Sequence, residues 1–402
     1  REGVFVADAP VAAAGVRAIA APPLPALRTQ PSVGHQRVGS ADISLSTVFI
    51  DSEILPRDKL ADCARSVLKS PGLSAFYEPQ GLGSLRELIA KRLRDRGMTD
   101  VTAANVIVTT GSQQAIDILS RTLEVRRVAM ESPVYSGAKL LIESQGIQTT
   151  GLVLDPFLGI PVDLWEKQLA TARPGLLYCI TSYQNPTGYS YTSHELSSVL
   201  ELAEKYGFAI AEDDWGSDML SGSEYRPMLR LLGGSNVVYI NSFTKKLLPS
   251  LRVGFMVADE RLVPALVTAK RLATLGNAWI TEAIVAEFLD RGYYDTHLIA
   301  LQRELDTRYA ACLYFLRELM PEGVRWTLPG GGPTLWLDLP RKVDLGMLEA
   351  RLGARGVRIE GVANAFFGEP HLHGFRVSYA FSPTAKLRCA LEIVAEEVRA
   401  LL

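Results

Sequence analysis

The feature that most constrains the fold is an alternation of short β-branched segments with amphipathic helical segments, from about residue 56 to residue 258. Such strands read as almost continuous apolar runs, which is typical of a mostly parallel sheet with helices on both faces. Ligands of such sheets bind in the loops that follow the carboxyl ends of the strands, so we expect a site there. The predicted strands are Val106 to Thr110, Arg127 to Met130, Gly175 to Thr181, Phe208 to Ala211, Val237 to Ile240 and Val253 to Val257.

The last third of the chain has a different pattern. A long helical region from Leu262 to Leu319 precedes a predicted strand from Thr334 to Leu339 and a return strand from Gly374 to Tyr379. This order is typical of an α+β domain, and 402 residues exceed what one hydrophobic core usually serves. Residues 9–31 are rich in Ala and Pro. We therefore predict an arm or linker over 1–42, a large domain over 43–262, and a long connecting helix with a smaller domain over 263–402.

The charge balance argues against binding to nucleic acid or to an anionic membrane. Lys and Arg number 42 against 44 Asp and Glu, which gives a formal net charge of −2. The four cysteines are far apart, and His371 and His373 have no third ligand nearby, so we expect no metal site. The sequence has no run long and apolar enough to span a membrane and no signal-peptide pattern, so we expect a cytoplasmic protein.

The segment between the last two predicted strands of the large domain contains two adjacent lysines, Lys245 and Lys246. They lie beside hydroxyl side chains and are followed by Arg252. A lysine amine forms an imine with an aldehyde, while a guanidinium and hydroxyls bind a phosphate. The segment therefore suits a phosphorylated aldehyde cofactor. On local evidence alone, a solvated pair of surface lysines is the alternative.

A turn of small residues, Gly111-Ser112, follows the strand that begins at Val106 and opens a helix. Free backbone N–H groups and the positive end of the helix dipole at such a turn suit a phosphate. The alternative is that Ser112 simply caps the helix.

Taken together, these segments resemble the PLP-dependent (pyridoxal 5'-phosphate) aminotransferases of class I/II and fold type I, most closely the aminotransferase-like domain of MocR/GabR-type proteins. The resemblance covers roughly residues 43 to 400. It implies an α/β fold with a mostly parallel seven-stranded sheet covered by helices, a smaller C-terminal α+β domain, and PLP as the cofactor. The motifs that carry it are Tyr77 to Arg86, Gly111 to Gln114, Glu131 to Tyr135, Tyr183 to Gly188, Glu212 to Trp215, Ser242 to Gly254 and Gly374 to Tyr379.

The resemblance implies a role for each matching residue. Lys245 is in register as the catalytic lysine that forms the Schiff base, and Lys246 falls out of register. Tyr135 stacks on the cofactor ring, and Asp213 keeps the ring nitrogen protonated so that the ring withdraws electrons. The residues assigned to the cofactor are Gly111, Ser112, Gln113, Tyr135, Asn185, Asp213, Trp215, Ser242, Lys245 and Arg252, with Tyr77 of the partner subunit.

The substrate side is assigned in the same way. Arg376 grips the α-carboxylate of the substrate with two parallel hydrogen bonds, and Asn185 approaches the same carboxylate. Because Tyr77 reaches the phosphate bound in the other subunit, the resemblance implies a homodimer with shared active sites. Amino acids and keto acids are the implied substrates.

Two segments depart from the family pattern. Trp215 stands where the MocR/GabR-type branch usually has a tyrosine that donates to the cofactor's phenolic oxygen. An indole N–H can also donate, and we hypothesise that loss of the phenol raises the pKa of the imine. The segment from Val48 to Pro56 also differs, and because it lines the substrate entrance in relatives, the choice of substrate does not carry over.

Transamination is the predicted reaction, with Lys245 as the group that moves the proton at the substrate's α carbon. The same residues also serve lyases, decarboxylases and oxidases, so these reactions remain alternatives. Arg1 to Ala7 resembles the last strand of the winged-helix wing of MocR/GabR-type regulators. An alternative function is therefore effector sensing in a longer protein, which would contact DNA only through a winged-helix domain outside this chain.

Overall fold

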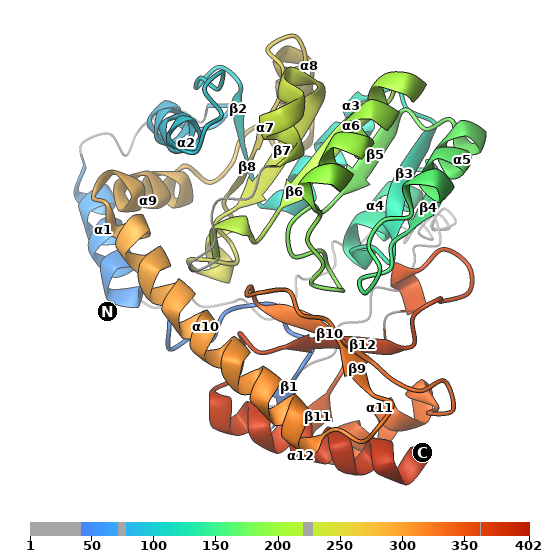
Figure 1. Cartoon of the computed structure of the whole chain (residues 1–402). Coiled ribbons are helices and arrows are strands. Elements are labelled where there is room, and N and C mark those ends of the chain that lie inside the picture. The colour runs from blue at the N-terminus through green and yellow to red at the C-terminus, as the bar shows by residue number, and fades with distance from the viewer. Residues whose placement is uncertain (1–41, 71–77, 220–227, 362) are drawn as a thin grey trace, which may run out of the picture. The chain divides into compact units, whose positions relative to one another are not determined.

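The computed structural model describes residues 42–70, 78–219, 228–361 and 363–402 (Figure 1). Tyr77, the wing-like segment Arg1 to Ala7 and the rest of the predicted arm except residue 42 lie outside the described residues.

A seven-stranded sheet forms the larger part of the structure (Figure 1). The strands lie in the order β2 (Val106–Thr109), β8 (Gly254–Val257), β7 (Val237–Ser242), β6 (Ala209–Asp214), β5 (Leu176–Cys179), β3 (Arg127–Ser132) and β4 (Gln148–Val153). Only the two pairs that include β8 are antiparallel, and all other pairs are parallel. The predicted α/β fold with a mostly parallel seven-stranded sheet is confirmed. The edge strand β4 has no counterpart among the predicted strands.

Apolar side chains on both faces of this sheet are buried. Along β3, Val128 and Met130 pack in one cluster and Ala129 in another, as the alternation of side chains along a strand requires. Helices cover the sheet in Figure 1. They are α2 (Gly83–Asp95), α3 (Ser112–Thr122), α4 (Ser136–Ser144), α5 (Val162–Ala172), α6 (Ser193–Tyr206), α7 (Leu229–Gly233) and α8 (Val263–Thr274). α1 (Arg57–Lys69) and α9 (Trp279–Asp290) pack against each other. Short 3-10 helices are Ser217–Met219, Gly234–Asn236, Pro249–Leu251 and Ala363–Ala365.

The C-terminal part is α+β. A three-stranded antiparallel sheet has β10 (Thr334–Asp338) between β12 (Gly374–Ser378) and β9 (Arg325–Trp326). The helices here are α10 (Tyr293–Leu319), α11 (Leu345–Ala354) and α12 (Thr384–Leu401). β1 (Ile43–Ser44) pairs in parallel with β11 (Val357–Arg358), so residues 43 and 44 are joined to this part and not to the large sheet.

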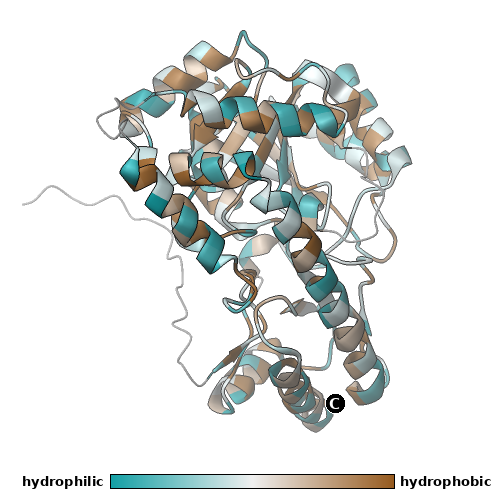
Figure 2. Cartoon of the chain, turned by 90° about the vertical axis from the view of Figure 1, so that its left-hand side faces the viewer, coloured by the Kyte–Doolittle hydropathy of each residue, from teal (hydrophilic) through white to brown (hydrophobic). Residues whose placement is uncertain are grey.

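The predicted helical region from Leu262 to Leu319 consists of three helices, α8, α9 and α10. Leu275 and Gly292, which follow α8 and α9, have positive φ angles of 57° and 67°, and this conformation ends a right-handed helix. Figure 2 shows that the helices carry both hydrophilic and hydrophobic residues. Among the described residues, none of the helices combines the length and the apolar character needed to cross a membrane.

Candidate active site

Three chain segments meet at one edge of the large sheet. Since β8 is antiparallel to both β2 and β7, the ends of β2 and β7 and the start of β8 lie together, and Gly254 pairs with Thr109 on one side and Ser242 on the other. The turn after β2, the Lys245 segment after β7 and Arg252 before β8 are therefore neighbours. This is the edge at which the sequence predicted a site.

The turn after β2 and Arg252 form a positively charged cradle. Gly111 has a φ of 81°, and a Cβ at this position would lie 2.7 Å from Arg252 Nη2. Arg252 Nη2 donates to the carbonyl oxygen of Thr110 at 3.1 Å. Gly111 is the N-cap of α3 and Ser112 its first residue, with no side-chain cap hydrogen bond. The alternative that Ser112 caps the helix is therefore wrong, and the helix N-terminus next to a guanidinium suits a phosphate.

The hydroxyl groups of the lysine segment differ in their use. Ser242 Oγ accepts from the backbone N–H of Thr244 at 3.1 Å and donates to the carbonyl oxygen of Val253 at 3.3 Å. Thr244 Oγ1 is buried and has no hydrogen-bond partner. Thr244, which the sequence analysis did not assign to the cofactor, is thus the hydroxyl that can donate to a phosphate, while Ser242 holds the loop.

Lys245 has an unusually acidic ammonium group. Burial, followed by the positive charges of Arg376 and Arg252, lowers its pKa to about 7, against the opposing effect of Asp213. Its Nζ lies 4.0 Å from the centre of the Phe49 ring. An amine with this pKa is partly neutral at physiological pH and can attack an aldehyde.

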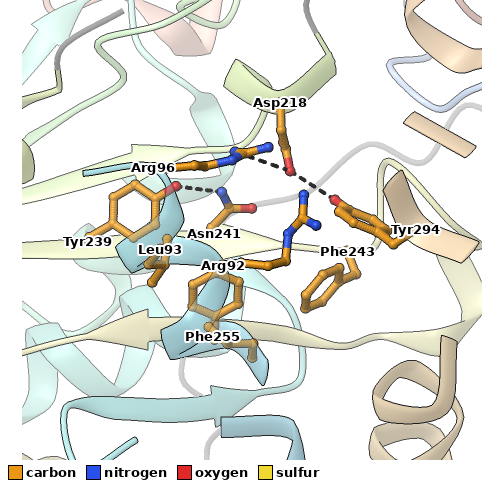
Figure 3. Close-up of a pocket in the computed structure, with 10 residues that line it drawn as sticks. Arg92, Leu93, Arg96, Asp218, Tyr239, Asn241, Phe243, Phe255 and Tyr294 are labelled. Atoms are coloured by element: carbon orange, nitrogen blue, oxygen red, sulfur yellow. Dashed lines mark hydrogen bonds and ion pairs between the residues drawn. The ribbon is translucent and has the colours of Figure 1, made fainter. Parts of the chain in front are cut away.

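The side-chain amine of Lys246 is engaged in an ion pair and a hydrogen bond. Its Nζ is 2.6 Å from Asp218 Oδ1 and donates to Asn241 Oδ1 at 2.6 Å. Figure 3 shows the pocket that Asp218 and Asn241 line, where Asp218 is joined to Arg96 and Tyr294. A buried ion pair of this kind leaves no free amine, which supports the predicted register with Lys245.

Asp213 is a buried carboxylate with one unpartnered oxygen. Its Oδ2 accepts from the Tyr178 hydroxyl at 2.7 Å, while Oδ1 has no partner. Burial raises the pKa of Asp213 to about 6, against the opposing effect of the Tyr178 hydrogen bond. Asp214, by contrast, accepts from the Tyr239 hydroxyl at 2.6 Å and from the backbone N–H of Ser217 at 2.9 Å. Asp214 is structural, as predicted, and Asp213 has an oxygen available to a cationic ring N–H.

Tyr135 and Gln113 are joined to each other. The Tyr135 hydroxyl donates to Gln113 Oε1 at 3.3 Å, and Gln113 Nε2 donates to the carbonyl oxygen of Gly137 at 3.0 Å. Burial raises the pKa of Tyr135. The Gln113 side chain thus positions the Tyr135 loop, and its backbone is the part available to a phosphate.

Asn185 and Arg376, which the sequence assigned to the substrate, are in direct contact. Asn185 lies in the loop after β5, Arg376 lies on β12, and Arg376 Nη1 donates to Asn185 Oδ1 at 2.6 Å. Arg376 Nη2 donates to the carbonyl oxygen of Ser46 and to Glu360 Oε2, the latter at 3.0 Å. Arg376 Nε is buried and unpartnered. The two parts of the structure therefore meet at this guanidinium.

The indole N–H of Trp215 has a different hydrogen-bond partner from the one that the sequence suggested. Its indole N–H donates to the carbonyl oxygen of Tyr183 at 3.0 Å, so this group is not available to the phenolic oxygen of a cofactor in this conformation. The indole is buried in the core of the large sheet. The single N–H of an indole makes one good hydrogen bond, and the backbone takes it.

Four further residues belong to the site although no predicted role covers them: Thr244, Tyr178, Phe49 and Glu360. Tyr178 lies within a predicted strand, and Phe49 lies in the segment from Val48 to Pro56 that the sequence analysis connected with the substrate entrance. Glu360 lies in no motif, so no sequence signal indicated it.

These residues fit PLP. The unpartnered oxygen of Asp213 suits a pyridinium N–H, the cradle at Gly111 suits a phosphate, and the amine of Lys245 suits an aldehyde. When bound, PLP supplies a ring that withdraws electrons from the bonds of the substrate's α carbon. No group of His, Cys, Asp and Glu side chains that could hold a metal occurs among the described residues.

The fold and this set of residues define a PLP-dependent protein of fold type I. The model of the family aminotransferase class I and II matches residues 51–394, and the chain belongs to this family, as predicted. PLP is its cofactor, and PLP-dependent transamination is its class of activity.

Relatives include both enzymes and regulators. The chain is 28% identical over 369 residues to aromatic-amino-acid aminotransferase 1 of Thermococcus litoralis, with 89% of the chain and 88% of the relative covered. It is 26% identical over 374 residues to the uncharacterized HTH-type transcriptional regulator YisV of Bacillus subtilis, with coverage of 92% and 76%. Among solved structures, it is similar to the α-aminoadipate aminotransferase LysN of Thermus thermophilus, complexed with N-(5'-phosphopyridoxyl)-L-leucine. The TM-score is 0.83, the identity 28%, and the coverage 90% and 93%.

Proposed function

We propose that this chain transfers the amino group of an amino acid to a keto acid and holds PLP on Lys245 as a Schiff base. The observation that carries the proposal is the chemistry of Lys245, whose pKa of about 7 provides a neutral amine. Arg252, just before β8 of the large sheet, and Arg376, on β12 of the smaller sheet, act on the same amine.

Each neighbouring residue has a defined task in this proposal. The Gly111 turn, Thr244 and Arg252 hold the phosphate, and Asp213 keeps the ring nitrogen protonated. Arg376 and Asn185 hold the α-carboxylate of the substrate, because the guanidinium offers two parallel donors. With PLP and a substrate bound, the Lys245 amine would be the group that takes up and returns the proton at the substrate's α carbon.

The proposed site residues divide between the two predicted domains, although residues 43 and 44 pair with β11 of the smaller one. The residues proposed for the cofactor lie within 43–262, while Arg376 lies within 263–402. Cys63, Cys179 and Cys312 are free and buried, which supports a reducing, cytoplasmic location.

A homodimer with shared active sites completes the proposal. Leu272 and Leu275 are 85% and 59% exposed, and they lie close in sequence to Asn277, whose Oδ1 is 3.3 Å from Thr110 Oγ1 beside the phosphate cradle. Large exposed apolar side chains next to a site favour a subunit contact there. Sedimentation at several concentrations tests it: a monomer at every concentration contradicts the dimer.

A spectral experiment tests the function. The yellow protein is mixed with a panel of amino acids that includes aromatic amino acids and 2-aminoadipate, the types named for relatives. Conversion to the pyridoxamine form, followed by return on addition of a keto acid, is the expected result. Lys245→Ala should abolish the yellow colour. If Lys246→Ala abolishes it and Lys245→Ala does not, the assignment of the lysine is wrong.

Effector sensing is the second candidate function, and the match to a regulator over 92% of the chain favours it. Repeated turnover with a keto acid supports the enzyme. A single binding or half-reaction event without turnover supports the sensor. Product analysis distinguishes the other reactions: a decarboxylase releases carbon dioxide, a lyase releases a fragment of the substrate, and an oxidase consumes dioxygen. Only transamination moves the amino group of the substrate onto the added keto acid.

A further inference from the structure

The arginine proposed to bind the substrate carboxylate already forms an ion pair with a carboxylate of the protein. Arg376 Nη2 is 3.0 Å from Glu360 Oε2, and the other nitrogen, Nη1, donates to Asn185. Bidentate binding of a carboxylate needs two neighbouring N–H groups on the guanidinium. A substrate α-carboxylate therefore has to share Nη2 with Glu360 or displace it.

The two partners of this ion pair differ in their access to water. The side chain of Arg376 is 11% exposed and that of Glu360 is 54% exposed. Arg376 lies on β12, within a sheet, whereas Glu360 follows β11 by two residues in a segment outside the helices and strands. Glu360 can turn toward water at little cost when a substrate arrives, but its charge stays near the entrance.

The charges around the site favour one class of substrate. The charged side chains that act on Tyr135 are Asp213, Arg376, Arg252 and Glu360. The cofactor's phosphate would neutralise the charge of Arg252, and its protonated ring nitrogen would neutralise that of Asp213. Of these four charged residues, Arg376 and Glu360 then remain for the substrate. The α-carboxylate then neutralises Arg376, and Glu360 is left as an uncompensated negative charge. A second carboxylate on the substrate would be repelled, whereas a neutral or cationic side chain would not.

We propose that Glu360 determines substrate specificity by selecting against amino acids with an acidic side chain and for those with a neutral or basic one. The inference rests on the proposed function, since it takes Arg376 as the site of the α-carboxylate. It adds the class of side chain that this site accepts.

Binding of two unreactive ligands to the holoprotein tests the inference. Glutarate and its monoamide have the same shape and differ by one negative charge. Calorimetric titration gives the ratio of their dissociation constants in the wild type and in Glu360→Gln. We expect the wild type to prefer the monoamide, and Glu360→Gln to reduce this preference by about 2- to 5-fold, the range typical of one interaction between exposed charges. High salt should reduce the wild-type preference, because salt screens exposed charges.

Glu369→Gln is the matched control. Glu369 is exposed and lies in the same segment, and its substitution removes the same charge. The control should keep the wild-type ratio, and a control that changes the ratio as much as Glu360→Gln overturns the inference. An unchanged ratio in Glu360→Gln overturns it as well.

Arg376→Gln separates this inference from the proposed function. If this variant loses affinity for both ligands while Glu360→Gln leaves the ratio unchanged, only the specificity role is wrong. If Arg376→Gln binds both ligands as the wild type does, Arg376 is not the carboxylate site, and both the substrate assignment and the inference fall.

Discussion

Changing the pH across the neutral range should control how fast the apoprotein captures PLP, because capture needs the neutral amine of Lys245. Burial and two arginines lower its pKa from 10.5 to about 7. About half of the amine is then neutral at pH 7, compared with about one in 3000 for an amine of ordinary pKa. The structure therefore predicts that capture at pH 7 is faster by about three orders of magnitude than the ordinary pKa would allow.

The assay follows the appearance of the yellow colour by stopped flow at saturating PLP, over a range from about pH 5.5 to pH 9. Since deprotonation makes the nucleophile, the rate should rise by about tenfold per pH unit below the pKa and reach a plateau above about pH 8. Arg376→Gln removes one of the charges that lower this pKa, so its profile should shift to higher pH. A wild-type rate that still rises in proportion to hydroxide at pH 9 would refute the reasoning.

Three further substitutions test other parts of the site, and a fourth, Gly146→Ala, is a control. In Gly111→Ala the new Cβ would lie 2.7 Å from a guanidinium nitrogen, so PLP affinity, measured by titration of the apoprotein, should fall by about tenfold or more. Gly146→Ala has a similar φ but nothing within 4 Å, and should lose only about 1 kcal/mol of stability and no affinity. Tyr178→Phe should lower the free energy of unfolding of the apoprotein in urea by about 1–3 kcal/mol at pH 8, because the Asp213 carboxylate loses a hydrogen-bond donor. The loss should be smaller at pH 5. Burial raises the pKa of Asp213 to about 6, so the carboxyl is mostly protonated there and depends less on the Tyr178 hydroxyl. An equal loss at both pH values contradicts this. Trp215→Tyr should lower the pKa of the imine in a spectral titration, and superimposable titrations would contradict the effect of the missing phenol.

The sequence predicted the fold well where strands are buried on both faces. Six of the seven strands of the large sheet have apolar runs that mark them within a few residues. The seventh, β4, has the sequence Gln-Thr-Thr-Gly-Leu-Val and lies at the edge of the sheet with partly exposed side chains. An edge strand needs no continuous apolar run, so its pattern is weak. The breaks at Leu275 and Gly292 were also missed, although Gly276, Asn277 and Gly292 are residue types that commonly end a helix.

The hydrogen-bond partners of individual side chains were harder to predict from the sequence than the places of the residues in the fold. Lys245 and Arg252 lie in the connection after β7, and Asp213 lies near the carboxyl end of β6, as expected, since parallel topology gathers these strand ends at one edge. The hydrogen bond from Tyr178 to Asp213 depends on the register of β5 against β6, in which Tyr178 pairs with Ala211. Register comes from the packing of the whole sheet, and the local sequence of either strand does not contain it.

The cofactor end and the substrate end of the site are held in place by different parts of the fold. Cofactor binding and substrate choice can therefore change independently. The cofactor end is built on strands of one sheet, whereas the substrate end depends on how β12 meets the loop after β5 at Arg376 and Asn185. The buried Arg308 of α10 fixes the segment after β12 to the segment before α1, because its Nη2 is 2.9 Å from Asp51 Oδ2 and its Nη1 donates to the carbonyl oxygens of Ala380 and Ser382. A buried ion pair fixes geometry even where it adds little stability. Glu360, in contrast, lies in an exposed segment, so a change there can alter which side chains are accepted without disturbing the cofactor residues.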